Sequence, residues 1–210
     1  HDGLLRPDLC AEAIRLGRLV VELMPGEAEA LGLYALMRLH DARRPARVDG
    51  AGALVPLEEQ DRSRWQADAI AEGLAALDEA LALRRRGPYQ LQAAIAALHA
   101  RAARAEDTDW KQIAALYGGL LHELPGAVVE LNAAVALAMA EGPARGLEWI
   151  ERLRRRDELA GYHLLPAARA DLLRRLGRRA EAAAAYAEAL ALVRNRAERL
   201  YLERRLAECG

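Results

Sequence analysis

Histidine and cysteine are the commonest ligands of transition metals in proteins, but the five histidines of this sequence are not spaced to hold a metal ion. They are scattered, and none has another His or a Cys four residues away; they are His1, His40, His99, His122 and His163. The sequence also has no Cys-x-x-Cys pair. We therefore expect no metal site and no cofactor.

The neighbours His40 and Asp41, followed by Arg43 and Arg44, could in principle perform acid–base chemistry. Such catalysis needs a reacting group beside the pair and a third group that orients it. No nucleophile with a partner stands near them, so we expect that the protein is not an enzyme. In the structural alternative, His40 and Asp41 cap a helix and the arginines pair with acidic residues further along, which are Glu58, Glu59 or Asp61.

Two further motifs could bind phosphate groups. Gly50-Ala51-Gly52 is a Gly-x-Gly sequence, but position 55 is Val where a dinucleotide-binding loop has Gly, so a turn is the better interpretation. The arginine triplets 84–86 and 154–156 lie near expected helix ends, where positive charge complements the helix dipole. We interpret them as solvated helix ends, and a phosphate-binding surface is the alternative.

Composition limits the class of protein that could position these residues. Hydrophobic residues make up 53% of the 210, and there is no Phe. The 30 basic and 31 acidic residues nearly cancel, so the net charge gives no reason to expect nucleic-acid or membrane binding. Cys10 and Cys209 lie at opposite ends, which favours a reducing cytoplasm over a disulfide framework, and no apolar run is long enough to span a membrane. The chain begins without Met, and we expect it to be a piece of a longer protein.

The positions of apolar residues predict helices along most of the chain. Ala182, Tyr186 and Ala189 share one helical face after a turn at Gly177, a spacing typical of the second helix of a tetratricopeptide (TPR) repeat. We predict an all-α fold: a TPR-like α-helical repeat array, with antiparallel helix pairs forming a superhelix, as a single domain over 1–210. The predicted helices span residues 8–23, 27–40, 61–85, 88–104, 109–123, 127–140, 143–156, 163–176, 178–193 and 196–208.

Residues 40–65 form the longest stretch without a helical period. Asp49-Gly50 stands between two short apolar runs, which predicts a short β-hairpin insertion near residues 46–57. A loop of this length in a compact repeat array is seldom passive. We expect the insertion to carry contacts that matter for function.

Polar residues also fall on predicted first helices of pairs, which line the concave groove of TPR arrays. Asn132, Arg169 and Asp171 are such residues, and each must pair internally or bind a ligand. The carboxylate clamp of TPR proteins needs Lys and Arg beside the Asn, whereas Leu131 and Val135 stand there, so that mode is disfavoured.

Several strings resemble one bacterial group, and they lie at 36–47, 57–65, 87–97, 108–110, 162–163 and 168–173. The most specific are His40-Asp41-Ala42-Arg43-Arg44 and Gln60-Asp61-Arg62-Ser63. They look like the C-terminal extension of extracytoplasmic-function (ECF) RNA polymerase sigma factors that carry a TPR-like domain. The resemblance covers about residues 8–208, but the two DNA- and polymerase-binding domains of such factors are absent from this chain.

The resemblance implies a cytoplasmic regulatory domain that binds protein. Its expected partners are the sigma domains of the same protein and possibly core RNA polymerase, with DNA reached only through the sigma domains and no membrane contact. The alternative is a domain that senses a small molecule and relays the signal to the sigma domains. In either case the candidate residues for interaction, or for a polar network that holds the insertion, are His40, Asp41, Arg43, Arg44, Gln60, Asp61, Arg62, Trp65, Tyr89, Gln92, Trp110, Asn132, Tyr162, His163, Arg169 and Asp171.

Overall fold

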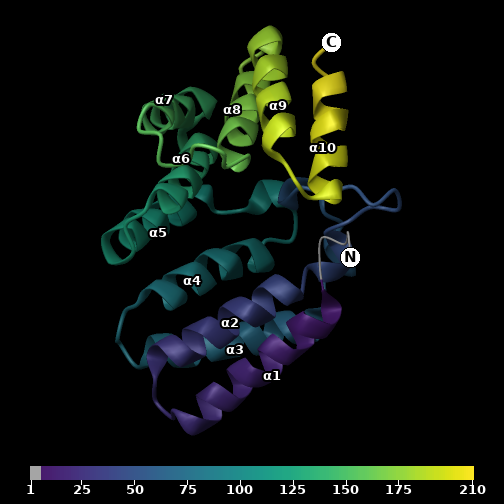
Figure 1. Cartoon of the computed structure of the whole chain (residues 1–210). Helices are drawn as coiled ribbons and strands as arrows, with labels where there is room; N and C mark the ends of the chain where they lie inside the picture. Colours follow the sequence, from purple (N-terminus) through teal and green to yellow (C-terminus); the bar gives the residue numbers. More distant parts are fainter. Residues whose placement is uncertain (1–5) are drawn as a thin grey trace. The chain divides into compact units, whose positions relative to one another are not determined.

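A computed structural model describes residues 6–210, which contain ten α-helices and no β-strand (Figure 1). The prediction of an all-α protein is confirmed, and helices that follow one another along the chain pack together, consistent with an α-helical repeat. The helices are α1 (Pro7–Leu23), α2 (Ala28–Asp41), α3 (Ala67–Ala82), α4 (Pro88–Arg101), α5 (Trp110–Glu123), α6 (Ala127–Glu141), α7 (Pro143–Arg154), α8 (Leu164–Arg175), α9 (Arg179–Leu192) and α10 (Arg196–Ala207).

The described residues form two compact units. The N-terminal unit comprises residues 6–49 and 55–109, with helices α1 to α4. The C-terminal unit comprises residues 50–54 and 110–210, with helices α5 to α10.

Helix α2 is the centre of the N-terminal unit, because α1, α3 and α4 all pack on it. Small residues permit this close packing. A Cβ atom at Gly32 of α2 would lie 2.8 Å from the backbone nitrogen of Gln90 in α4. One at Gly73 of α3 would lie 2.8 Å from Cγ of Leu39 in α2. As a result α4 packs mainly on α2 and less on α3, its neighbour in sequence.

The C-terminal unit is built from helices that pack on their neighbours in sequence, from α5 on α6 through to α9 on α10. Ala182, Tyr186 and Ala189 of α9 are fully buried in its core, as their spacing predicts. Asn195 caps α10 by accepting hydrogen bonds from the N–H groups of Ala197 (2.8 Å) and Glu198 (3.3 Å). Leu202 then places α10 against the same core.

The predicted β-hairpin near residues 46–57 is not supported. Short 3₁₀ turns at Arg44–Ala46, Leu57–Glu59 and Arg62–Arg64 occupy the segment between α2 and α3, where the described residues form no strand. An isolated β-bridge is present, at Val48 and Leu54, beside the hydrogen bond from the Val55 N–H to the carbonyl of Arg47. The Leu54 N–H donates to the Ala197 carbonyl of α10. The runs on either side of Asp49-Gly50 are at the short end of strand lengths, so the pairing does not extend beyond this bridge.

Among residues 6–210, no helix combines the length and the apolar composition needed to cross a membrane.

Candidate functional site

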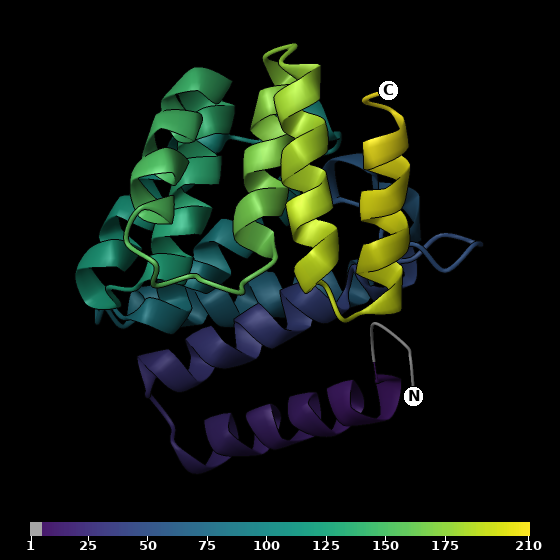
Figure 2. The same ribbon diagram turned by 45° about the horizontal axis from the view of Figure 1, so that its top comes forward.

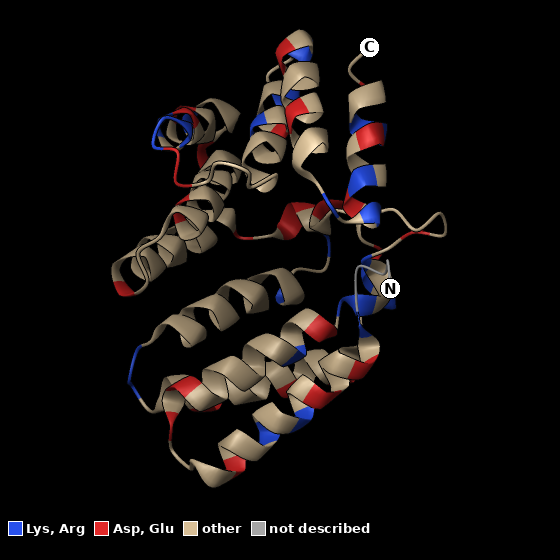
Figure 3. Cartoon of the chain, viewed as in Figure 1, with Lys and Arg blue, Asp and Glu red and all other residues tan. Residues whose placement is uncertain are grey.

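A hollow with a volume of about 160 Å³ lies between α1, α2 and the segment that follows α2. We call it the basic hollow; it is lined by Cys10, Ala13 and Ile14 of α1, by Met37, His40 and Asp41 of α2, and by Arg44 and Arg47. Three of the residues that the sequence singles out, His40, Asp41 and Arg44, therefore line one cavity. Arg43 is next to it in the chain, and Figure 3 shows this segment as one of the basic parts of the chain.

The positive charge of the basic hollow is only partly balanced. The Nε of Arg44 pairs with the Asp41 carboxylate at 3.3 Å. The guanidinium groups of Arg43 and Arg47 have no hydrogen-bond or ion-pair partner within residues 6–210. The expectation that Arg43 and Arg44 pair with Glu58, Glu59 or Asp61 is therefore wrong, because Arg44 pairs with Asp41 and the Asp61 carboxylate is bound locally by Ser63.

Burial, and after it the neighbouring positive charges, lowers the pKa values of Arg43, His40 and His99. Burial, together with the charges of Arg47 and Arg62, lowers the pKa of Arg43 to about 10. Solvent reaches part of His40, yet desolvation by the surrounding side chains and the charges of Arg43 and Arg47 lower its pKa to about 4. The pKa of His99 is lowered to about 4 by burial and then by Arg43, Arg62 and His40. Both histidines are thus neutral near pH 7.

The second half of the insertion is fixed by contacts within the N-terminal unit. Nη1 of Arg62 donates to the carbonyls of His99 (2.5 Å) and Ala102 (2.8 Å), which satisfies the C-terminal end of α4. The same guanidinium stacks on Trp65, with 4.5 Å from Cζ to the ring centroid, and Trp65 is only 7% exposed. Arg62 therefore joins the insertion to α4 and to the core.

Gln60 and Asp61 also make contacts close to them in the chain. The Nε2 of Gln60 donates to the Val55 carbonyl at 3.0 Å. The Asp61 carboxylate accepts from the N–H of Ser63 (3.0 Å) and from its hydroxyl (2.6 Å), and these bonds lower the pKa of Asp61. These are the contacts expected of a polar network that holds the insertion.

The remaining candidates of the N-terminal unit lie at the start of α4. Tyr89 is 41% exposed, and its backbone N–H donates to Glu29 at 2.9 Å. The side chain of Gln92 donates to the Pro88 carbonyl at 3.2 Å, within the first turn. Neither lines the basic hollow.

In the C-terminal unit, two charged candidates of α8 pair internally. Nε of Arg169 donates to Glu151 of α7 at 2.7 Å. Asp171 accepts from Arg174 (2.5 Å) and Arg175 (2.6 Å). Burial raises the pKa of Asp171, but the bonds and charges of Arg175 and Arg174 outweigh this and hold it below its usual value. Both side chains therefore form ion pairs within the unit.

The other candidates of this unit do not form a common site. His163 stands 3.4 Å from the Glu198 carboxylate, and its ring is 6.0 Å from that of Tyr162. Asn132 is exposed on α6, and Trp110 begins α5.

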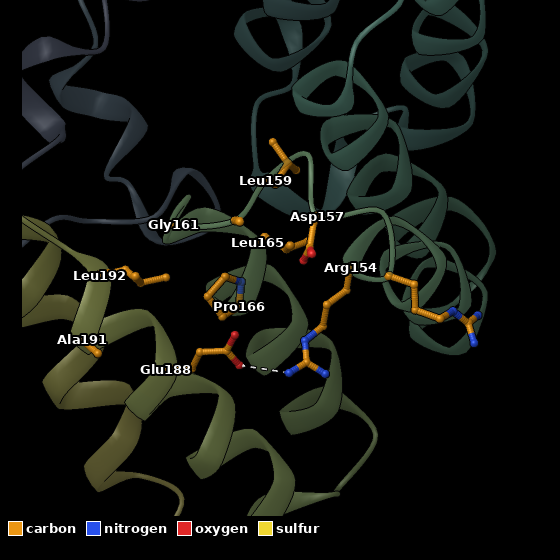
Figure 4. A pocket seen from close by; sticks show the side chains of 11 residues that line it. Arg154, Asp157, Leu159, Gly161, Leu165, Pro166, Glu188, Ala191 and Leu192 are labelled. Atoms are coloured by element: carbon orange, nitrogen blue, oxygen red, sulfur yellow. Dashed lines mark ion pairs between the residues drawn. The ribbon is translucent and has the colours of Figure 1, made fainter.

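A larger cavity in the C-terminal unit is lined by none of the candidate interaction residues, although Arg154 and Arg155 of the second arginine triplet line it. This cavity, the α7–α8 groove, has a volume of about 510 Å³ and lies between the loop after α7 and helix α9 (Figure 4). Arg154 and Glu188 form an ion pair at 3.5 Å across it, beside apolar residues such as Leu165 and Pro166. Asp157 adopts the left-handed conformation (φ 55°), which shapes the loop. In the sequence, the arginine triplet 154–156 is the feature that could have pointed to this groove.

No group of three or more His, Cys, Asp or Glu side chains in the described part of the chain could hold a metal ion.

Comparison with known proteins adds little about activity. Residues 1–81 match the model of a family described as a family of unknown function, DUF6596. The chain is also similar to an uncharacterized protein of Rhizobium meliloti (strain 1021), with 49% identity over 199 residues. That match covers 95% of this chain but 47% of the relative, so the chain spans about half of the relative's length. No solved structure matches the chain.

Proposed function

We propose that this chain is a regulatory protein-interaction domain of an ECF-type RNA polymerase sigma factor. In this proposal it is a TPR-like superhelix in the bacterial cytoplasm and controls transcription initiation by contacting the sigma domains of its own protein or core polymerase. The resemblance of the His40–Arg44 and Gln60–Ser63 strings to such extensions supports it. The greater length of the Rhizobium relative is consistent with further domains.

The observation that carries the proposal is a second apolar face on α1. One face, with Ile14, Gly17 and Val21, packs on the core of the N-terminal unit. On a different face of α1, large apolar side chains are exposed to solvent; they are Leu9, Leu16, Val20 and Leu23, which follow one another at spacings of seven, four and three residues. Leu19 and Met24 lie beside this face and are exposed as well. Leu23 is 72% exposed and Leu9 54%. Figure 2 shows α1 at the edge of its unit, with α2 on one side.

Exposed apolar patches of this extent are typical of protein–protein interfaces. A helix that is apolar on two sides packs best between two neighbours. Within the proposal, a helix of the sigma domains covers the outer face of α1. The charged side of α1 pairs within the unit, for example Glu12 with Arg15 at 2.7 Å, so the recognition expected there is mainly apolar.

A pull-down of this domain with the separately expressed sigma domains, and with core polymerase as a second bait, tests the proposal. Leu16→Glu and Leu23→Glu should abolish binding, since each places a charge in the apolar face, and should leave unfolding by urea little changed. Leu81→Glu in α3 is the matched control, because Leu81 is also exposed (51%) but stands outside the face. Binding that survives both α1 substitutions, or fails with the unmodified domain, would refute the contact through α1.

The second candidate is the small-molecule sensor, favoured by the volume and lining of the α7–α8 groove. Ligands that bind the folded state raise the unfolding temperature. In a thermal-shift screen, a compound that binds this groove should raise the unfolding temperature of the unmodified protein and of the Leu16→Glu variant, but not that of the Glu188→Gln variant. A screen in which no compound shows this pattern would count against the sensor.

A further inference from the structure

The basic hollow carries positive charge that its own unit does not neutralise. Of its two lining arginines, Arg44 is balanced by Asp41 and Arg47 is not. Arg43, close enough to Arg47 to feel its charge, is also without an acidic partner in residues 6–210. The two guanidinium groups repel each other in partly buried surroundings, where charges are weakly screened.

Such an arrangement is unfavourable unless an opposite charge enters. An unpaired buried charge costs free energy, and an oxyanion that accepts hydrogen bonds from guanidinium groups offsets that cost. Arg is the side chain best matched to carboxylate and phosphate, because its planar fork donates two parallel hydrogen bonds. His40 is a further possible donor on the same lining.

The size and the other lining residues limit what can enter. The volume of about 160 Å³ is below the roughly 300–1,000 Å³ of pockets that hold drug-sized ligands. Ala13, Ile14 and Met37 give the hollow an apolar part beside the charged one. That combination suits a small anion with a short apolar stem better than a large or purely polar ligand.

We propose that the basic hollow is a binding site for a small oxyanion, a carboxylate or a phosphate, whose charged group pairs with Arg47. The site does not depend on the proposed role in transcription, since it is formed wholly within the N-terminal unit. It is also separate from the α7–α8 groove.

Isothermal titration calorimetry of the 210-residue protein tests the site, with inorganic phosphate and butyrate as probes and butanol as the uncharged analogue. Chloride keeps the ionic strength constant. We expect saturable binding of phosphate or butyrate, and none of butanol. The better of the two probes identifies the oxyanion as phosphate or carboxylate.

Variants separate a specific site from general attraction. Arg47→Gln should weaken binding at least tenfold while leaving the protein folded, and should raise its resistance to urea because repulsion with Arg43 is removed. Arg194→Gln is the matched control: it removes the same charge from an exposed position in the C-terminal unit and should not change the affinity. Ala13→Leu, which narrows the hollow without altering charge, should also weaken binding.

The proposal is wrong if neither anion binds, or if Arg194→Gln weakens binding as much as Arg47→Gln does. It is also wrong if no small anion binds and Arg47→Gln instead disrupts the pull-down of the sigma domains. In that case Arg47 would form an ion pair with an acidic side chain of a protein partner.

Discussion

The carboxylate of Glu29 occupies the space that a side chain at Gly87 would need. A Cβ atom at Gly87 would lie 2.3 Å from Cδ of Glu29. From this position Glu29, on α2, accepts hydrogen bonds from the backbone N–H groups of Tyr89 (2.9 Å) and Gln90 (3.1 Å). The N-cap residue of α4 is Gly87, which has no side chain to cap the helix. Glu29, 60 positions before Tyr89, supplies the cap instead.

This arrangement predicts coupled effects at the two positions. Glu29→Ala should lower the free energy of unfolding by about 1 kcal/mol, as is usual for the loss of an N-terminal cap. Gly87→Ala should cost a similar amount, because the carboxylate must move away. In the double variant the costs should not add, since the cap is already lost, and a double-mutant cycle by urea unfolding measures this. Additive costs would show that Gly87 acts independently of Glu29.

A second prediction compares one substitution at two helical glycines. A Cβ atom at Gly146 of α7 would lie 2.4 Å from Cβ of Ala138 and 2.5 Å from the Ala134 carbonyl oxygen, both in α6. At Gly118 of α5 nothing stands within 4 Å. Gly146→Ala should destabilise by about 1–3 kcal/mol through overpacking. Gly118→Ala should stabilise by about 0.5–1 kcal/mol through helix propensity.

Thermal and urea unfolding of the two glycine variants should give changes of opposite sign. If both substitutions stabilise the protein, the close crossing of α6 and α7 is not maintained in solution.

The helices could be predicted from the sequence because their signals are local. Apolar spacing acts within a few residues, and so does a cap such as that of Asn195 on α10. Packing between helices that follow one another was predicted, but packing between helices further apart in the chain was not. That α4 packs on α2 depends on the contact of Gly32 with Gln90, 58 positions apart, and periodicity identifies an apolar face without naming its neighbour. The division of the chain into domains stays a prediction.

The candidate site was predictable only in part, for the same reason. The sequence indicates a polar cluster around His40 to Arg44, but residue types alone do not show which nearby acidic residue pairs with which arginine. The structure uses Asp61 to fix the turn at Ser63 and Asp41 to hold Arg44, so Arg43 and Arg47 remain unpaired within residues 6–210. Arg47 stood outside the candidate residues, since its importance lies in the partner that it lacks.

Arg62 gives the third prediction. Its guanidinium spans two carbonyls of the α4 terminus and stacks on Trp65, so Arg62→Ala should cost about 1.5–3 kcal/mol, the range for hydrogen bonds to charged groups. Arg62→Lys should recover only a part, since an ammonium is a point charge without a planar face. Arg64→Ala, in the same 3₁₀ turn but exposed, should change stability by less than about 0.5 kcal/mol. Equal costs for Arg62→Ala and Arg64→Ala, by urea unfolding, would rule out this anchoring role.

The fourth prediction concerns pH. His40 and His99 have pKa values of about 4 in the folded protein and about 6.5 when unfolded, because burial and the charges of Arg43, Arg47 and Arg62 disfavour their protonation. Between about pH 4 and 6.5 the unfolded chain therefore binds more protons than the folded chain. The free energy of unfolding should fall as the pH is lowered through this window and should not depend on these histidines above about pH 7.

Urea unfolding at a series of pH values measures this dependence, to which each histidine adds a slope of at most about 1.4 kcal/mol per pH unit. His99→Gln should reduce the slope between pH 4 and 6.5, whereas His122→Gln, at an exposed position of α5, should leave it unchanged. If the basic hollow binds an oxyanion beside Arg47, the added negative charge should raise the pKa of folded His40 and so narrow the pH window from its lower edge. If the unmodified protein, His99→Gln and His122→Gln all show the same slope of unfolding free energy against pH, the cationic cluster does not lower the pKa of these histidines.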